Sequence, residues 1–161
     1  MLRKATLLAA MVAVMSVAAA GVAWAVTEIG GPGPDHIVGT DGVDQLYGLG
    51  GEDDIEGREG DDFEVGGTHP DRLSGGLGGD DLRGGLGNDI LYGGNGEDEL
   101  YGQEGQDNLF GGFLDDNLHG KDGVEGNDFV SGGDGTDDIC HADSIDEIDV
   151  TSCEKRDVGP Q

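Results

Sequence analysis

A unit of nine residues, with the form GGxGxDxUx where U is a large apolar residue, recurs twelve times between Gly30 and Cys140. A period this short limits the fold, because one unit cannot bury a core of its own and has to stack on its neighbours. Every unit carries an aspartate at its sixth position, in the order Asp35, Asp44, Asp53, Asp62, Asp71, Asp80, Asp89, Asp98, Asp107, Asp116, Asp128 and Asp137. We interpret these regular carboxylates, framed by glycines, as the ligand side of a coil whose turns are held together by bound cations.

The composition allows a second interpretation. The 161 residues include 35 Asp and Glu, 8 Lys and Arg, and 34 glycines, which gives a formal net charge of −27. Such a chain also resembles a disordered polyanion. Compositional disorder does not require aspartate at one phase of a nine-residue period, so we expect order in the ion-loaded state and leave disorder open for the ion-free state. The negative charge argues against a nucleic acid partner.

The N-terminal residues 1–25 are predicted to be a secretory signal peptide. Met1 to Lys4 is basic, residues 5–22 are apolar, and Ala23-Trp24-Ala25 has the small-x-small pattern of a cleavage site. A retained membrane anchor is the alternative. We therefore expect cleavage after Ala25, a mature chain without a membrane span, and a secreted, extracellular protein that is either released or associated with the cell surface.

Two cysteines lie near the C-terminal end. We predict a disulfide between Cys140 and Cys153, which fits an exported protein and would contribute on the order of 3 kcal/mol through the loop it closes. A metal site is the alternative, but the two cysteines lack the CxxC spacing of structural zinc. Residues 141–161, where the repeat ends, are predicted to cap the open end of the stack.

Glycine occupies position one of all twelve units and position four of ten, with His69 and Leu114 as the exceptions. We expect the glycines at both positions to take positive φ and to turn backbone carbonyls inward. Carbonyl and carboxylate oxygens without His or Cys favour calcium over zinc or copper, and a flexible loop suits calcium better than magnesium.

Position eight predicts the core. It is apolar in eleven units, namely Ile37, Leu46, Ile55, Leu73, Leu82, Leu91, Leu100, Leu109, Leu118, Val130 and Ile139, and it is Glu64 in the remaining one. Positions seven to nine read as a short strand with its middle side chain turned inward. One buried Leu or Ile gains ~1.5–3 kcal/mol, whereas fixing each of nine backbones costs ~1–2 kcal/mol. The chain should therefore need its cation to fold.

Units such as Gly30–Val38, Gly75–Arg83, Gly84–Tyr92 and Gly93–Tyr101 resemble the hemolysin-type calcium-binding, or repeats-in-toxin (RTX), nonapeptides. The resemblance covers residues 30–140 and implies an all-β fold, a right-handed parallel β-roll spanning residues 26–140 with two repeats per turn. It also implies that each ion lies between one repeat and the second repeat after it, so the chain would hold up to about ten calcium ions. The ligands implied are the twelve aspartates and the loop carbonyls of Gly31, Gly33, Gly76, Gly78, Gly85, Gly87, Gly94 and Gly96.

Three departures from the pattern have structural consequences. Residues 120–122 are an insertion, which predicts a bulge or widened loop. His69 and Leu114 replace the loop glycine and put the sites of repeats five and ten in doubt. At Glu64, either the register slips so that Phe63 or Val65 faces inward, or the core is locally broken.

No catalytic constellation is visible. The four histidines, His36, His69, His119 and His141, fall at unrelated phases of the repeat, and no Ser or Cys nucleophile has a base nearby in sequence. We expect a non-catalytic calcium-dependent binding or structural module; the alternatives are an accessory or relic of a larger RTX toxin or hydrolase, and a calcium buffer or surface adhesin. The aromatic residues at position nine, Tyr92, Tyr101 and Phe110, either pack across strands or form a patch for a glycan or a surface protein.

Overall fold

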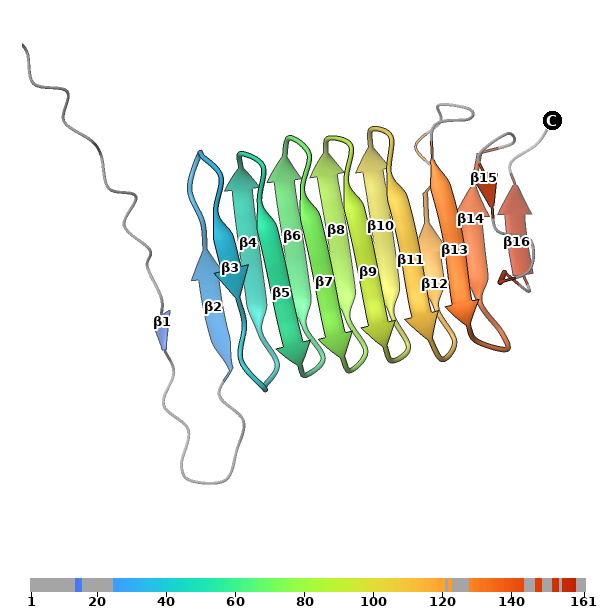
Figure 1. The fold of residues 1–161 in the computed structure, drawn as a ribbon, viewed down its shortest axis with the longest axis horizontal. Coiled ribbons are helices and arrows are strands. Elements are labelled where there is room, and N and C mark those ends of the chain that lie inside the picture. Colours follow the sequence, from blue (N-terminus) through green and yellow to red (C-terminus); the bar gives the residue numbers. More distant parts are fainter. Residues whose placement is uncertain are drawn as a thin grey trace, which may run out of the picture.

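The computed structural model describes residues 14–15, 25–120, 122, 128–143, 147–148, 152–153 and 155–158. All regular elements among these residues are β-strands, and they form two sheets. Figure 1 shows the strands stacked side by side, with loops at both edges that carry the chain from one sheet to the other. In sheet order, the nine-stranded sheet contains β1 (Val14–Met15), β2 (Val26–Ile29), β4 (Gln45–Gly50), β6 (Phe63–Thr68), β8 (Asp81–Leu86), β10 (Glu99–Glu104), β12 (Asn117–His119), β14 (Ile139–Ala142) and β16 (Lys155–Val158). The seven-stranded sheet contains β15 (Glu147–Ile148), β13 (Phe129–Asp134), β11 (Asn108–Phe113), β9 (Ile90–Asn95), β7 (Arg72–Leu77), β5 (Asp54–Glu59) and β3 (His36–Val38).

From β2 onward, consecutive strands alternate between the two sheets, so two nonapeptides make one turn of a coil. From β2 onward each strand pairs in parallel with the second strand after it, while β1 pairs with β2 antiparallel. Leu82, for example, lies opposite Leu100, which in turn lies opposite Leu118. This arrangement of about six turns confirms the predicted parallel β-roll.

Most strands are twice as long as predicted. The regular strands span six residues, from position seven of one unit to position three of the next, as in β7. The ladder continues beyond position nine because position two also pairs with its counterpart two units later, as Gly76 does with Gly94. The loop therefore contains only positions four to six, and the aspartate is its last residue.

The core is a column of single side chains from each sheet, as position eight predicts. The position-eight side chains from Ile37 to Val130 are at most 1% exposed, and outward-facing residues flank them on each strand. Glu64 is the polar member of this column and is fully buried. Because each turn contributes only two such side chains, the core is thin along its whole length.

The last unit is displaced by one residue from the predicted register. Leu118 lies opposite Cys140, so Cys140 faces inward and the prediction of Ile139 at this place is wrong. Asp138 is fully buried in the place predicted for Asp137, which is exposed. The loop of this unit contains one residue more than the nine-residue repeat, so the aspartate and the inward side chain that follow are displaced by one position.

The insertion before the eleventh unit is confirmed by spacing. Asp107 is followed in the ladder by Asp128, 21 residues later, where the regular interval is 18. Gly120, the residue after β12, donates its amide to His141 O at 2.9 Å, and the regular pairing of β12 with β14 ends there. The predicted bulge at residues 120–122 is described only at its two ends, because residue 121 and the following residues 123–127 lie outside the described residues.

The C-terminal tail adds one strand to each sheet. β15 pairs with β13, and β16 pairs with β14. The Cys140–Cys153 disulfide is confirmed, with the two Cα atoms 5.9 Å apart. Ser152, next to the bond, accepts the amide of Gly132 at 3.1 Å, so the tail is tied to the last full turn by a covalent bond and by hydrogen bonds.

Within the described part of the chain, no helix is long and apolar enough to cross a membrane. The predicted signal peptide lies outside the described residues except for Val14, Met15 and Ala25.

Candidate metal centre

One oxygen of each loop aspartate joins two turns of the coil. Asp62 Oδ1 accepts the backbone amide of Asp44 at 2.8 Å, and Asp80 Oδ1 accepts that of Asp62 at the same distance. The same bond recurs through both loop rows, from Asp35–Asp53 to Asp116–Asp138. Sequence reasoning missed this role, although the 18-residue interval between successive bonds is visible in the sequence. The aspartates therefore form two hydrogen-bonded rows, one along each edge of the roll.

In eight of these aspartates the second oxygen has no hydrogen-bond partner, whereas Oδ2 of Asp35 accepts the amide of Gly31 and Oδ2 of Asp44 accepts that of Thr40. Oδ2 is buried and forms no hydrogen bond in Asp53, Asp62, Asp71, Asp80, Asp89, Asp98, Asp107 and Asp116. Among the described residues, ion pairs form on other carboxylates, those of Asp54, Asp81 and Glu99. A buried carboxylate oxygen without a donor is costly unless a cation or a proton compensates it. The rows therefore fit a set of metal ligands.

Burial controls the protonation of these rows. Loss of solvent raises the pKa of Asp62 and Asp80 to about 7, and that of Asp71 to about 6, against the opposing effect of the hydrogen bond from the backbone. Neighbouring aspartates raise the pKa values further, because like charges approach one another along each row. Without a positive ion these carboxyls therefore retain protons at a pH where an exposed aspartate is ionised.

The position-one glycines make room for the carboxylates. A Cβ atom on Gly57 would collide with Asp62 Oδ2 and lie 2.7 Å from the carbonyl oxygen of Gly75. The described position-one glycines do not have positive φ, so that prediction is wrong. Positive φ occurs instead at positions two and four, for example +118° at Gly94 and +128° at Gly78. Glycine is required at position one because oxygen atoms fill the space that a side chain would occupy.

The loop carbonyls point along the coil toward the unit two repeats later. A Cβ atom on Gly51 would lie 2.7 Å from Gly33 O, and one on Gly96 or Gly105 would collide with the oxygen of Gly78 or Gly87. Among the predicted carbonyl ligands, the oxygens of Gly33, Gly76, Gly78, Gly87 and Gly94 show this arrangement. Gly85 and Gly96 are on the other side of such a contact, because a Cβ atom on either would collide with the carbonyl oxygen of Gly67 or Gly78 in the preceding turn. Gly31 O differs, because it accepts the amide of Gly50 at 3.2 Å.

The two loops without a position-four glycine keep a similar carbonyl direction. His69 and Leu114 take φ of 84° and 78°, and positive φ also occurs at position four in Gly51, Gly60, Gly78 and Gly105 but not in Gly87 or Gly96. Their carbonyl oxygens lie against Gly87 and Gly135, as the glycine carbonyls do in other units. The replacements thus leave the backbone arrangement unchanged at the expense of strain.

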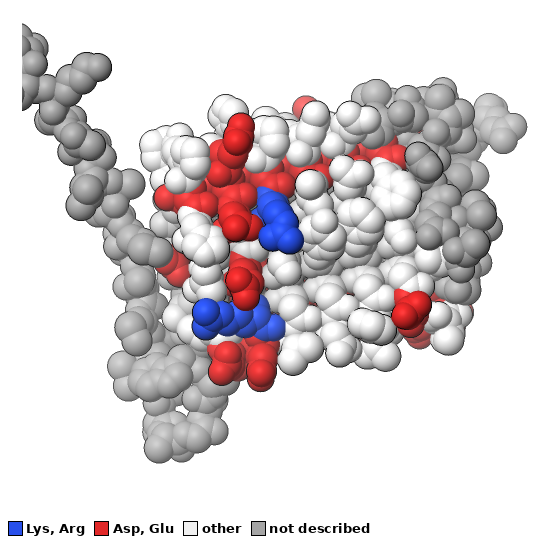
Figure 2. Space-filling model, in the orientation of Figure 1, with Lys and Arg blue, Asp and Glu red and all other residues white. Residues whose placement is uncertain are grey.

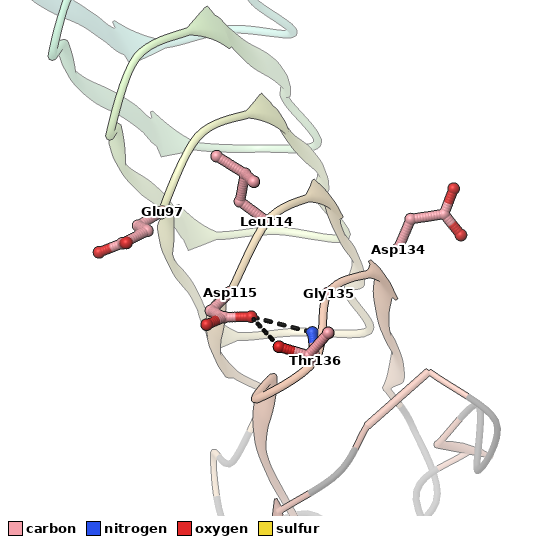
Figure 3. Close-up of a pocket in the computed structure, with 6 residues that line it drawn as sticks. All are labelled: Glu97, Leu114, Asp115, Asp134, Gly135 and Thr136. Carbon is pink, nitrogen blue, oxygen red and sulfur yellow. Dashed lines mark hydrogen bonds between the residues drawn. The ribbon is translucent and has the colours of Figure 1, made fainter.

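A shallow hollow between the loops of repeats eight, ten and twelve is lined by Glu97, Leu114, Asp115, Asp134 and Thr136 (Figure 3). Asp115 Oδ1 accepts both the amide of Thr136 at 2.9 Å and its hydroxyl at 3.3 Å. Glu97 and Asp134 point away from the hollow. It is an open part of the loop edge, distinct from the buried aspartate row.

No three His, Cys, Asp or Glu side chains come together as a metal cluster in the ranges that the structure describes. Any ion between the turns would therefore draw most of its ligands from backbone carbonyls and only one or two from carboxylates. An all-oxygen set of this kind fits calcium and excludes a zinc or copper site of imidazole or thiolate type.

The model of the RTX calcium-binding nonapeptide repeat, in four copies, matches residues 29–64, 65–100 and 83–118, together more than half of the chain. The chain belongs to this RTX family. RTX repeats bind calcium, and the aspartate rows and loop carbonyls are the parts of this chain that carry the RTX pattern. The matched residues are the regular RTX units, whereas the two units after the insertion lie beyond them. No curated protein and no solved structure matches the chain.

Charged and aromatic side chains gather on different parts of the outer surface of the RTX roll. Figure 2 shows acidic side chains in a band along the edge at which β5, β7 and β9 begin, with basic side chains over β5 and β7. Toward β9 and β11 the sheet surface carries Tyr92 and Phe110, stacked with ring centroids 5.1 Å apart, and Arg72 lies 5.2 Å from the Tyr92 ring. These rings pack across strands, as the first of the two interpretations predicts.

The other sheet carries a stack that sequence reasoning missed. The ring of His119 lies between those of Tyr101 and His141, with centroids 4.4 Å and 4.5 Å away. Burial and the neighbouring His141 lower the pKa of His119. His119 and His141 fall at different phases of the repeat in the sequence because the insertion and the displaced last unit lie between them.

Proposed function

We propose that this protein is an exported calcium-binding RTX β-roll that folds when calcium binds between its turns and acts outside the cell as a non-catalytic binding or structural module. The observation that carries the proposal is the row of buried, unpartnered aspartate oxygens, repeated at each regular turn. Such a row needs positive charge at regular intervals, and the described basic side chains lie elsewhere.

The ions would be held between one repeat and the second repeat after it. Aspartate Oδ2 atoms such as those of Asp62 and Asp80 would supply charge, and carbonyls such as those of Gly60 and Gly78 would complete the oxygen set. Calcium would supply the positive charge that the chain lacks, and its binding free energy would become folding free energy. We propose up to about ten such ions, one for each pair of facing repeats.

Export is supported by the N-terminal sequence pattern and by the disulfide. The leader pattern of residues 1–25 fits cleavage after Ala25. A Cys140–Cys153 disulfide persists in an oxidising compartment, and calcium is abundant outside cells. We propose a secreted protein, either released or held at the cell surface, where the roll presents the sheet face that carries Tyr92 and Phe110 to a surface protein or glycan.

Calcium titration of residues 26–161, followed by circular dichroism and calorimetry, tests this function. We expect a disordered spectrum in chelator, a β-sheet spectrum on addition of millimolar calcium, and binding of several ions per chain. A spectrum that does not change with calcium, or a stoichiometry of one ion, would contradict the proposal. Detection of the uncleaved leader on protein recovered from the culture medium would contradict the proposed cleavage.

A further inference from the structure

Glu64 is a carboxylate inside the apolar column of the roll. The register is unbroken here, because Glu64 lies opposite Leu46 on one side and Leu82 on the other. The alternative of a register slip that turns Phe63 or Val65 inward is therefore wrong. The side chain of Glu64 is 0% exposed, and neither Oε1 nor Oε2 forms a hydrogen bond.

The carboxylate is directed toward the loop aspartate of its own repeat. Its Oε1 lies 2.8 Å from the place of a Cβ on Gly57, where Asp62 Oδ2 and the carbonyl oxygen of Gly75 also converge. The three oxygens, from one repeat and the repeat two units later, thus lie against the same side of Gly57, which brings the carboxylates of Glu64 and Asp62 close to one another. The backbone amides of Ser74 and Gly57 approach the carboxylate and act to lower its pKa, but burial and the charges of Asp80 and Asp62 outweigh them and raise the pKa, and neither amide has the geometry of a full hydrogen bond.

No basic side chain compensates this group among the described residues. Arg72 and Arg83 pair with Asp54 and Asp81 on the outer surfaces of the sheets. Asp62 and Asp80, the closest charged groups, are themselves acidic and make the site more negative. A carboxylate in this position, fully desolvated and beside a second carboxylate, is compensated either by a proton or by a positive ion that contacts both carboxylates.

We propose that Glu64 is a calcium ligand that reaches the Asp62 site from inside the roll, so that the ion held there binds two carboxylates of one repeat. The inference rests on the proposed calcium function and adds a site type that the repeat pattern does not contain. The other regular repeats carry Leu, Ile or Val at this position, so their ions have one carboxylate fewer. Because calcium affinity rises with the charge of its ligands, this site binds the tightest ion of the roll.

The test compares three variants of residues 26–161 by calorimetric calcium titration. Glu64→Gln keeps the shape and removes the charge, and Glu64→Leu carries the side chain of most other repeats, so it keeps a foldable core. Glu56→Gln on β5 is the matched control, since Glu56 is exposed and faces outward. We expect both Glu64 variants to fold in calcium but to lose the tightest binding event or weaken it on the order of tenfold or more, with Glu56→Gln unchanged.

The outcomes separate this inference from the proposed function. If the native chain binds no calcium, the proposed function fails. If the native chain binds calcium and Glu64→Gln or Glu64→Leu binds as many ions with equal affinity, the inference about Glu64 is overturned while the function stands. Difference infrared spectra of native protein and Glu64→Gln in saturating calcium give a second readout. A protonated carboxylic acid band that disappears in Glu64→Gln would also overturn the inference.

Discussion

At the scale of single residues, the loop aspartate performs two tasks with its two oxygens. Oδ1 accepts the amide of the aspartate two repeats earlier, as Asp98 does from Asp80 at 2.8 Å, and Oδ2 stays buried without a donor. Position-one glycine is part of the same arrangement, because any side chain there would occupy the space of Oδ2. Aspartate at position six and glycine at position one are therefore required together.

The aspartates make calcium binding depend on pH. Burial raises the pKa of Asp62, Asp80, Asp89 and Asp116 to about 7 in the calcium-free fold, above the unfolded value of about 3.9. The calcium-free fold thus holds more protons than the unfolded chain between these values, and its stability falls as the pH rises through about 7. Calcium binds the ionised carboxylates, so the affinity of the calcium-free fold for calcium rises as the pH rises.

The calcium-free chain that we propose is unfolded, so its aspartates titrate near the unfolded value of about 3.9. We accordingly expect the apparent calcium affinity to stay nearly constant from about pH 8 to about pH 5.5 and to fall steeply as the pH decreases toward about 4, where calcium has to displace protons from the unfolded chain. Calcium titrations followed by circular dichroism at several pH values measure this dependence. A steep fall already between about pH 8 and about pH 5.5, with proton release detected by calorimetry, would show that a calcium-free fold with protonated aspartates precedes binding.

At the scale of elements, the coil imposes positive φ on residues that carry a side chain. In the loop that joins β6 to β7, His69 at position four takes positive φ although it is not glycine. Leu49, Arg58 and Gln103 also take positive φ at position two, near the ends of their strands. A left-handed backbone costs a residue with a Cβ atom about 1–2 kcal/mol, so the contacts between turns outweigh local preference.

Substitution of His69 by glycine should therefore stabilise the calcium-bound protein. We expect His69→Gly to raise the free energy of unfolding by about 0.5–1 kcal/mol, since relief of strain exceeds the additional entropy of the unfolded chain. Urea unfolding in saturating calcium measures the change. Gln106→Gly is the matched control, because Gln106 is an exposed, uncharged loop residue outside the positive-φ set, and there glycine should destabilise.

At the scale of the whole molecule, the roll is a one-dimensional stack in which each turn contacts only its neighbours. Its C-terminal end is closed by β15 and β16 and by the Cys140–Cys153 disulfide, and Cys140 is also the last side chain of the inward column. The disulfide therefore joins the end of the core to the tail that covers it. Stability in such a stack depends on its ends, because an uncovered end frays first.

Removal of the disulfide should destabilise that end in particular. We expect the double variant Cys140→Ala, Cys153→Ala to lose about 3 kcal/mol of unfolding free energy in calcium. Hydrogen exchange should show faster exchange of the amides of β13 and β14, while those of β7 and β9 keep their protection. Equal loss of protection along the entire roll would mean that the molecule unfolds as one cooperative unit.

Much of this protein could be predicted from its sequence, because the fold repeats a unit whose chemistry is local. The nine-residue period predicted a stacked coil with an inward leucine column and regular aspartates, the resemblance to RTX repeats implied the parallel roll, and the two cysteines predicted the disulfide. The tertiary structure decided what depends on contacts between turns. It showed that position-one glycines are required for space, that Asp138 and Cys140 replace Asp137 and Ile139, and that His119 stacks on His141. It also placed Glu64 in the core, because strand pairing on both sides holds the register more strongly than one buried carboxylate can shift it.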